Sequence, residues 1–458
     1  MSECPARKND APLRRINDFF AEKNDIPQKD CDFSVINKEK AGDIPRKQEK
    51  EKSMARFVYA DNAATTAVSP EVREAMMPAF CELYGNPSSL HKKGRDAKVA
   101  LDGARARIAA ALGCEPREIY FTSCGTESDN WAVKSGAALM KRKSGRTHIV
   151  TTKIEHHAVL NSCAALEKEG YTVTYVGVTP DGIVNMDELR AAVTDETALV
   201  AVMYVNNEIG TIQPIAEITK IAHEHGALMF TDAVQAAGNI KIDIPALGVD
   251  MLSVSGHKLH APKGIGLLYV RRGLVLPNLI DGGGQERGRR GGTENLPYIL
   301  GLARAVEIAD ERLSDNPRVA RMRDRLIDEL TSKIPYSYLN GSRTERVCGN
   351  VNIRFDFIEG ESLLLWLDIA GIAASTGSAC ASASLDPSHV MLAIGVPHEK
   401  AHGSLRLSIS HETTEEDVDY IIEQLPPIVK RLRDMSPLWE EAQRGGDREH
   451  WGKVSKIR

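Results

Sequence analysis

The lysine best suited to chemistry in this sequence is Lys258, which lies in the run SVSGHKLHAPKG from residue 253 to residue 264. A short apolar stretch ends just before it, and its neighbours include a serine, a glycine and a histidine. Small and polar neighbours of this kind suit an anion and an amine. Because lysine amines form Schiff bases with carbonyl compounds, Lys258 is a candidate to hold an aldehyde cofactor.

Other polar groups also follow apolar stretches. Gly125 and Thr126 come after a predicted strand and begin a helix, where backbone N–H groups and a hydroxyl can hold a phosphate. His156 follows HIVTT, Asn207 follows ALVAVMYV with one asparagine between, and Asp232 ends ALMFTD. Taken singly, His156, Asn207 and Asp232 are better explained as helix-start, turn and helix-cap residues. Because open α/β sheets bind ligands at the carboxyl ends of their strands, we expect these groups to meet.

Together these groups provide what pyridoxal phosphate requires of a protein. The carboxylate keeps a ring nitrogen protonated, the imidazole stacks on the ring, the helix start binds phosphate and the lysine provides the amine. The sequence therefore predicts a pyridoxal 5'-phosphate site.

The surrounding pattern predicts an α/β fold. From about residue 70 to residue 310, apolar strands alternate with helical stretches, such as the helix 95–112 that ends at Gly113, which indicates βα units around a mostly parallel sheet. After a helical stretch over 297–331, strand and helix patterns return and predict a second, smaller α/β domain. We expect a disordered leader over 1–55, a joining segment over 56–70, a large cofactor-binding domain over 71–314, a small domain over 315–440 and a tail over 441–458.

Composition excludes several classes of protein. The chain has 458 residues, a net charge of −5 and 42% hydrophobic residues, which is typical of a soluble protein that does not bind nucleic acid. The basic stretch ERGRRGG at 286–292 could contact RNA, but a single short basic loop in a net acidic chain is more commonly structural. No apolar run is long enough to span a membrane, and the acidic residues of the leader argue against mitochondrial import, so we expect a cytoplasmic protein. The leader either forms a solvated tail or precedes a start of translation at Met54. The eight scattered cysteines predict neither disulfides nor a metal or iron–sulfur site.

Several motifs resemble known enzymes. DNAATT at 61–66, YGNPSSLH at 84–91, SCGTESDN at 123–130 and VNNEIGT at 205–211 resemble the class V aminotransferase superfamily. TDAVQAAG, SGHKLHAPKGIG, ERGRRGGTEN and STGSACASASLDPSHV are similar to the NifS and IscS type of cysteine desulfurase, especially NifS. The resemblance runs from about residue 57 to about residue 440. It implies the fold of a type I pyridoxal-phosphate-dependent transferase, with a mostly parallel seven-stranded sheet in the large domain and a smaller C-terminal α/β domain.

The resemblance also implies residue roles and a homodimer. Lys258 would form the Schiff base and remove the Cα proton, His156 would act as acid or base near the substrate thiol, and Arg406 would bind the substrate carboxylate. Without the resemblance, Arg406 is read equally well as an exposed strand residue. The cofactor contacts would come from Gly125, Thr126, His156, Asn207, Asp232, Gln235, Ser255, His257 and Lys258 of one subunit and from the partner subunit's Thr293.

Cys380 decides the reaction. It lies among Ser, Gly and Ala residues that are typical of a mobile loop, and the resemblance implies that its thiol takes the sulfur of L-cysteine as a persulfide and leaves L-alanine. A small buried cysteine is the alternative role for Cys380, whereas Cys124 is predicted to serve in packing. The expected partner is a sulfur acceptor or an iron–sulfur scaffold protein. Rival functions are a selenocysteine lyase or an aminotransferase of the same fold, and a scaffold without catalysis.

Overall fold

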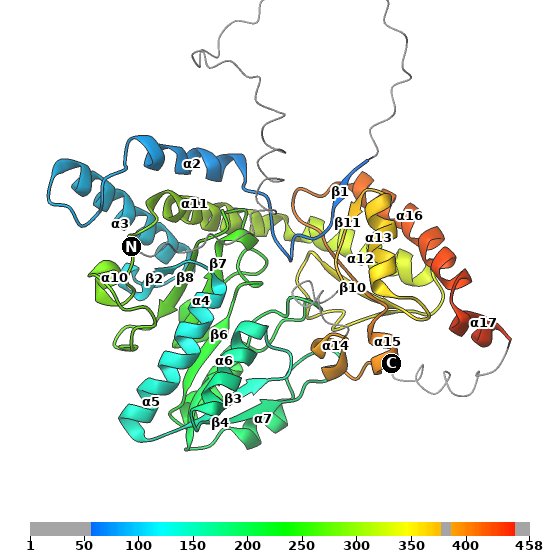
Figure 1. The fold of residues 1–458 in the computed structure, drawn as a ribbon, viewed down its shortest axis with the longest axis horizontal. Helices are drawn as coiled ribbons and strands as arrows, with labels where there is room; N and C mark the ends of the chain where they lie inside the picture. Colours follow the sequence, from blue (N-terminus) through cyan, green and yellow to red (C-terminus); the bar gives the residue numbers. More distant parts are fainter. Residues whose placement is uncertain (1–55, 377–385, 445–458) are drawn as a thin grey trace, which may run out of the picture. The chain divides into compact units, whose positions relative to one another are not determined.

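The structure, a computed structural model, describes residues 56–376 and 386–444. Its largest element is a seven-stranded sheet in the order β2-β8-β7-β6-β5-β3-β4 (Figure 1). The strands are β2 (Ile119–Thr122), β3 (His148–Thr152), β4 (Thr172–Val176), β5 (Thr197–Ala201), β6 (Leu228–Asp232), β7 (Met251–Ser255) and β8 (Gly266–Val270). Only β8 runs antiparallel to its neighbours in this sheet. The prediction of a mostly parallel seven-stranded sheet is confirmed.

Both faces of this sheet are buried. Along each strand, alternate side chains point to opposite faces, so that Val150 and Val200 join one apolar cluster while Ile149 and Leu199 join another. The first cluster includes residues of α2 (Pro70–Cys81), α3 (Lys92–Leu112), α7 (Met186–Ala192), α8 (Ile215–Glu224), α9 (Ile244–Leu247) and α11 (Leu296–Arg312). The second includes residues of α5 (Gly136–Ser144) and α6 (His157–Lys168). Helices on both faces explain why the strands are apolar throughout.

Two predicted helices are interrupted. The stretch 125–143 forms α4 (Gly125–Asn130) and α5, separated by a π-helical turn at Trp131–Ser135, where the buried Trp131 donates its indole N–H to the carbonyl of Pro277 over 2.9 Å. The stretch 297–331 forms α11 and α12 (Asn316–Lys333), separated by a 3-10 turn at Leu313–Asp315. The helix predicted over 95–112 is confirmed as part of α3, and Gly113 ends it with a φ of 73°.

The C-terminal part contains a smaller antiparallel sheet. Its order is β12-β10-β9, with β9 (Ser337–Leu339), β10 (Asn350–Phe355) and β12 (Ser404–Ser408). A separate apolar cluster joins these strands to α12, α13 (Gly360–Ile369) and α16 (Glu415–Asp434). Near the start of the described chain, β1 (Val58–Tyr59) pairs in parallel with β11 (Ile372–Ala373). The remaining helices are α10 (Gln285–Gly288), α14 (His389–Ala393), α15 (His398–Ala401) and α17 (Pro437–Gln443).

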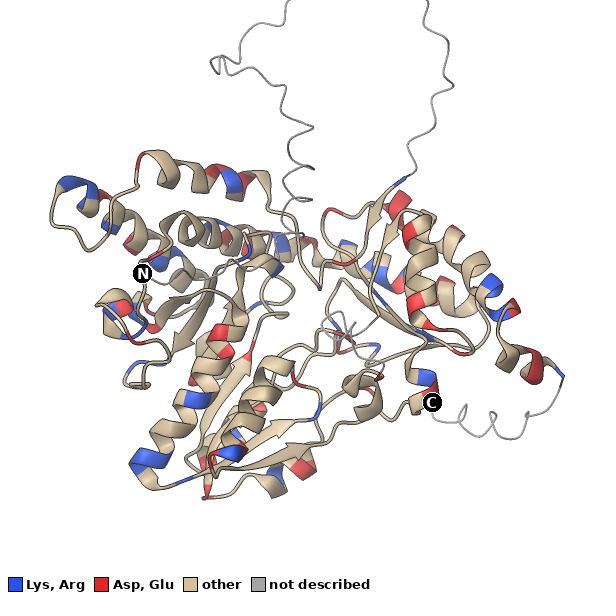
Figure 2. Ribbon diagram, viewed as in Figure 1, with Lys and Arg blue, Asp and Glu red and all other residues tan. Residues whose placement is uncertain are grey.

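Charged side chains of both signs are distributed over the outer surfaces. In the view of Figure 2, Lys and Arg residues are interspersed with Asp and Glu residues along the helices. Within residues 56–376 and 386–444, no helix combines the length and the apolar character that crossing a membrane requires. The leader over residues 1–55 lies outside the described residues, as does the tail from residue 445.

Candidate active site

The carboxyl ends of the parallel strands open into a cavity of about 260 Å³. Strands β3, β5, β6 and β7 each lead into a segment that contributes to its lining. The predicted site residues in this lining are Gly125, Thr126, His156, Asn207, Asp232, Gln235, Ser255, His257, Lys258 and Arg406. The structure thus brings together the predicted residues with the exception of Thr293 and Cys380.

Lys258 ends a short 3-10 turn, Gly256–Lys258, directly after β7. Its amine donates hydrogen bonds to the carbonyls of Ala63 (2.6 Å) and Ala64 (2.7 Å), which belong to the DNAATT motif. The turn packs closely, because a Cβ atom at Gly256 would lie 2.7 Å from a methyl carbon of Ile265. A segment about two hundred residues earlier in the chain therefore holds the lysine at the cavity.

Asp232 provides a carboxylate at the bottom of the cavity. Its side chain is 5% exposed and accepts a hydrogen bond from the backbone N–H of Val234 over 2.9 Å. Burial raises the pKa of Asp232, while the electrostatic effects of His156 and Lys258 and the Val234 hydrogen bond act in the opposite direction. A cationic group at this position would favour the ionised carboxylate.

Two further buried acids, Asp129 and Glu155, were not predicted from the sequence. The Ser253 hydroxyl donates to Asp129 over 2.6 Å, and burial together with the charge of Asp232 raises the pKa of Asp129 well above its usual range. Glu155 accepts from the backbone N–H of Met203, and burial raises its pKa to about 8. Three buried carboxylates so close together cannot all be ionised at little cost. Asp232 is the one that is ionised most easily, because the Lys258 amine stabilises its charge.

The start of α4 forms a cradle of small and hydroxyl-bearing residues. Cys124 precedes the helix without capping it, so its side chain leaves the first N–H groups available. A Cβ atom at Gly125 would lie 2.8 Å from a methyl of Val234 and 3.3 Å from Ser255, so glycine is needed for close approach. Thr126 and His257 complete this side of the cavity. Burial lowers the pKa of His257 to about 4, with contributions from two nearby lysines, so its imidazole is neutral at pH 7.

His156 has a defined position and tautomer. It precedes α6 as the N-cap residue, and its Nδ1 accepts a hydrogen bond from the backbone N–H of Ala158 over 3.2 Å. The prediction that His156 begins a helix is therefore confirmed. The same residue also lines the cavity. A neutral ring that accepts at Nδ1 carries its proton on Nε2.

Arg406 is a buried residue of β12, so the reading of it as an exposed strand arginine is wrong. Its side chain is 2% exposed and donates through Nη1 to the carbonyl of Asn207 and through Nη2 to Asp61, both over 3.0 Å. Its Nε is buried without a hydrogen-bond partner among the described residues. Asp61 belongs to the DNAATT motif, and sequence reasoning gave it no role.

Three remaining predictions differ in outcome. The side chain of Gln235 donates to the carbonyl of Ala63 over 2.9 Å, at the same oxygen that accepts from Lys258. Thr293 does not line the cofactor cavity of its own chain and instead lines a separate cavity beside Ser123 and Arg290. Cys380 lies outside the described residues.

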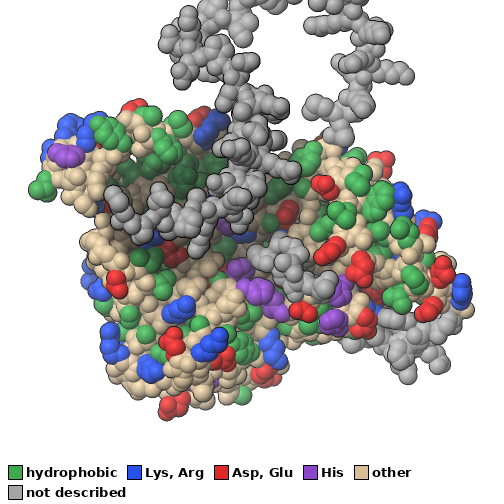
Figure 3. Space-filling model, in the orientation of Figure 1, with side chains coloured by type: hydrophobic (Ala, Val, Ile, Leu, Met, Phe, Trp, Pro, Cys, Tyr) green, Lys and Arg blue, Asp and Glu red, His purple; other side chains and the backbone are tan. Residues whose placement is uncertain are grey.

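Histidines also gather near the cavity. Figure 3 shows histidine side chains grouped on the face of the molecule that Figure 1 views. His157 and His389 line the cavity, with ring centroids 4.9 Å apart. The Ser388 hydroxyl donates to the buried Glu208, whose pKa is raised by burial. None of these residues was assigned from the sequence, although Glu208, Ser388 and His389 lie within the quoted motifs and His157 follows His156.

Three residues of the basic stretch 286–292 make contacts within the described chain. The Glu286 carboxylate pairs with Arg105 through two hydrogen bonds of 2.8 and 2.7 Å. Arg290 pairs in the same way with Glu127. Arg287 lies over the ring of Tyr120, with 4.1 Å between the guanidinium carbon and the ring centroid.

The residues of the cavity fit a pyridoxal phosphate group. The buried Asp232 lacks an ion-pair partner among the described residues, which suits a protonated ring nitrogen. The cradle at Gly125 is uncapped and rejects a Cβ atom, which suits a phosphate approached by backbone N–H groups. Lys258 supplies the amine. The donor set therefore agrees with the cofactor predicted from the sequence.

Comparisons with known proteins identify the family of this chain. The profile of the family described as Aminotransferase class-V matches residues 58–421. A cysteine desulfurase IscS of Methanosarcina thermophila is 55% identical over 382 residues, which cover 83% of this chain and 94% of the relative. The solved structure of a NifS-like protein has a TM-score of 0.77 and 39% identity, covering 82% of this chain and 100% of its own. A structure of SspA in complex with cysteine has a TM-score of 0.68 and 37% identity, covering 77% and 99%.

Proposed function

The chain belongs to the class-V aminotransferase family, and we propose that it is a pyridoxal-phosphate-dependent cysteine desulfurase. Such an enzyme takes the sulfur atom of L-cysteine and leaves L-alanine. The observation that carries the proposal is the meeting of Lys258, Asp232 and the start of α4 at one cavity. The similarity to enzymes named cysteine desulfurase supports the choice of reaction within the family.

The cofactor, when bound, supplies an aldehyde for covalent attachment and a ring that takes up electrons. Asp232 would keep the ring nitrogen protonated, because the buried carboxylate gains most from a cation beside it. The N–H groups at Gly125 and Thr126, with the Ser255 hydroxyl, would bind the phosphate. Gln235 and Asn207 would contact the ring hydroxyl.

Lys258 and Arg406 would act on the substrate directly. The Lys258 amine, which two carbonyls hold at the cavity, would remove the proton at the substrate Cα. Arg406 would bind the substrate carboxylate through N–H groups that Asp61 and Asn207 leave unused. His156 carries a proton on Nε2 and would donate it near the substrate thiol.

Cys380 would receive the sulfur. Its thiolate would form a bond to the substrate sulfur as the substrate Cβ–S bond breaks, so that a persulfide remains on Cys380 and the bonding electrons stay with the substrate carbon. The substrate carbon then takes up a proton, and alanine leaves. Because Cys380 is central to this step, it is the residue to test first.

The proposal extends to partners and organisation. We infer a homodimer, because Thr293 lies away from the cofactor cavity of its own chain. The persulfide would pass its sulfur to an acceptor or iron–sulfur scaffold protein in the cytoplasm. The division into a large domain over 71–314 and a small domain over 315–440 also stays a proposal, which the separate apolar cluster of the C-terminal part supports.

The experiment compares Lys258→Ala, Cys380→Ala and the control Cys124→Ala. Lys258→Ala is expected to abolish alanine formation and change the cofactor absorbance, because the covalent link to the cofactor is lost. Cys380→Ala is expected to keep that absorbance while alanine and sulfide release fall by about a thousandfold or more. Cys124→Ala should stay active. Alanine release and persulfide labelling are the measurements.

Each rival function gives a different result. Undiminished activity of Cys380→Ala would refute the persulfide step. An aminotransferase would consume a keto acid and would not need Cys380. A selenocysteine lyase would prefer selenocysteine when the two amino acids compete.

A further inference from the structure

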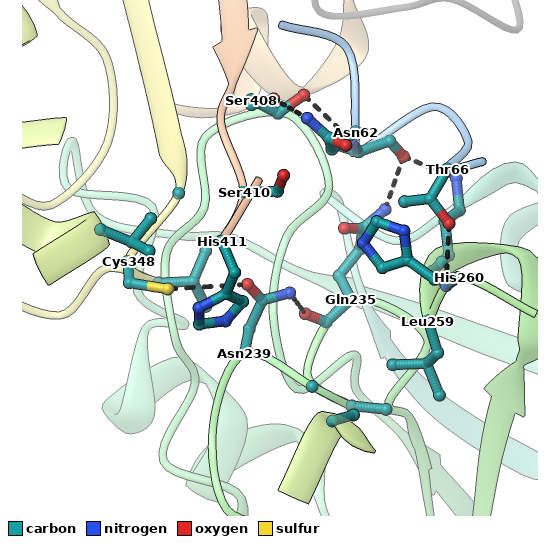
Figure 4. A pocket seen from close by; sticks show the side chains of 18 of the residues that line it. Asn62, Thr66, Gln235, Asn239, Leu259, His260, Cys348, Ser408, Ser410 and His411 are labelled. Carbon is teal, nitrogen blue, oxygen red and sulfur yellow. Dashed lines mark hydrogen bonds between the residues drawn. The ribbon is translucent and has the colours of Figure 1, made fainter. Parts of the chain in front are cut away.

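A second cavity, of about 90 Å³, adjoins the one described above. The two cavities share Ala63, Gln235 and Lys258 in their linings. The second is enclosed by the DNAATT segment, the end of α11, the start of α12 and the residues that follow β12. Figure 4 shows His411 and Cys348 on one side of this space and Thr66 and His260 on the other. None of the roles assigned so far uses it.

The polar lining of this cavity is positive and rich in donors. Among the described residues that line it, none is Asp or Glu. Arg312 is half-buried at the end of α11 and lines the cavity. Within the described chain, its guanidinium makes no hydrogen bond or ion pair of its own. A guanidinium in this position presents planar donors that match a carboxylate.

Two imidazoles of the lining have ring nitrogens whose donor and acceptor roles are set by their neighbours. His260 contacts the carbonyl of Ala67 through Nδ1 over 3.1 Å, and His411 contacts the carboxylate of Asp315 through Nδ1 over 3.2 Å. Because these oxygens only accept, Nδ1 carries the hydrogen in both rings. Burial lowers the pKa of His260, so this ring is neutral at pH 7 and leaves Nε2 as an acceptor.

Part of the remaining lining is apolar, and the rest consists of Asn, Gln, Ser and Thr side chains. Ile308, Val319, Val347 and Ile409 all line the cavity. Water molecules beside these aliphatic side chains lack hydrogen-bond partners on that side. The cavity volume of about 90 Å³ corresponds to roughly three liquid waters at about 30 Å³ each. A molecule with one anionic end and a short hydrocarbon part satisfies both walls.

We propose that this cavity is a second ligand site, which binds a short-chain carboxylate of about three carbons with its anionic end on Arg312 and its alkyl part against Ile308, Val319 and Val347. Simple acids and small amino acids share this chemistry. An amino acid would also place its ammonium group where the Nε2 of His260 accepts.

The site is coupled to the active site through the backbone they share. The carbonyl of Ala63 accepts from both Gln235 and Lys258. His260 has a φ of 60°, a left-handed conformation that is costly for a residue with a side chain, and the Thr66 hydroxyl accepts from its N–H over 2.8 Å. A ligand between these segments would restrict the movement of Lys258.

Titration of the holoenzyme with propionate and with L-alanine tests the proposal. At concentrations about tenfold above the Kd, binding is expected to raise the thermal midpoint by about 1–3 °C. Arg312→Gln should keep normal desulfurase activity, and when it is introduced into Arg406→Gln, whose active site lacks the group proposed to bind carboxylates, it should abolish this rise. Arg406→Gln, which alters the active site instead, should keep it. Calorimetric titration of the same variants would measure the stoichiometry.

A cavity-filling variant guards against misfolding of Arg312→Gln. Ala309→Leu places extra carbon atoms at a residue that lines the cavity, so it should abolish ligand binding without lowering the thermal midpoint. A stronger effect of alanine than of propionate would identify an amino acid site, and the reverse a simple acid site. The proposal is wrong if neither ligand binds Arg406→Gln at tens of millimolar or if adding Arg312→Gln to that variant leaves its response unchanged. Both results stand apart from the desulfurase proposal, because neither depends on turnover.

Discussion

Glu155 holds a proton that an exposed glutamate would have lost. It is fully buried, and its pKa is raised from 4.5 to about 8. Between these two pH values the folded protein keeps the proton that the unfolded chain releases. The free energy of unfolding therefore falls as pH rises, by at most about 1.4 kcal/mol per pH unit for one group.

We expect Glu155→Gln to remove this dependence, because glutamine keeps the shape and stays neutral. Relative to the native protein, the variant should gain about 2–4 kcal/mol in unfolding free energy between pH 5 and pH 8. Urea denaturation at several pH values measures this change. The exposed Glu224→Gln is the control and should follow the native curve. Parallel curves for Glu155→Gln and the native protein would show that Glu155 is ionised.

Single residues were predictable where chemistry follows directly from a strand end. His156 and Asp232 were found because each closes or follows an apolar stretch. Asp61 was not, because its partner Arg406 is 345 residues away and only folding brings them together. Asp129 lies within SCGTESDN and Glu155 precedes His156, but the polar residues beside them give no local sign that either carboxylate is buried.

At the scale of elements, the short helix α10 is held by one buried ion pair. Glu286 and Arg287 adopt left-handed backbone conformations, with φ of 47° and 60°, that glycine tolerates more easily. The Glu286 side chain is 3% exposed and pairs with Arg105 of α3, and it also accepts from the N–H of Phe121 in β2. One carboxylate thus joins three elements.

Glu286→Gln should destabilise the protein strongly, because it leaves the Arg105 charge buried without its partner. We expect a loss of about 3 kcal/mol in unfolding free energy. Glu307→Gln removes a more exposed partner of Arg107 and should cost less than about 1 kcal/mol. Equal losses in the two variants, measured by urea denaturation, would mean that the buried pair gives no special support to α10.

Element types were predictable wherever periodicity was long and regular. The strands β3, β6 and β7 and the helix α3 follow the predicted patterns. The break at Trp131–Ser135 was not predicted, because the apolar period continues through it and tertiary packing decides where the helix turns. The break at Leu313–Asp315 was missed although Asn316 and Pro317 directly after it are typical of the start of a new helix. The antiparallel direction of β8 depends on its pairing with β2 and β7, which local sequence does not encode.

At the scale of the whole molecule, the proposed dimer assigns the cofactor site to two chains. Thr293→Val and Lys258→Ala should each be defective as homodimers. A heterodimer of the two should regain activity, because one of its two sites combines the native Lys258 of one chain with the partner subunit's Thr293. Activity of the dual-tagged, purified heterodimer is the measurement.

The two homodimers, mixed without exchange of subunits, are the control for this experiment. A heterodimer no more active than this mixture would place Thr293 in the site of its own chain. Light scattering would show directly whether the protein is a dimer.

The pairing of β1 with β11 governs when the enzyme can become active during synthesis. Val58 pairs with Ile372, and Asp61 bonds to Arg406 from 345 residues away. At ribosomal rates of about 5–20 residues per second, the first strand waits on the order of tens of seconds for its partner to be made. During that interval β1 is unpaired. The carbonyls of Ala63 and Ala64, which follow β1 and accept from the Lys258 amine, are therefore not yet fixed in place. The nascent chain is therefore expected to reach catalytic competence only after β11 and Arg406 have left the ribosome.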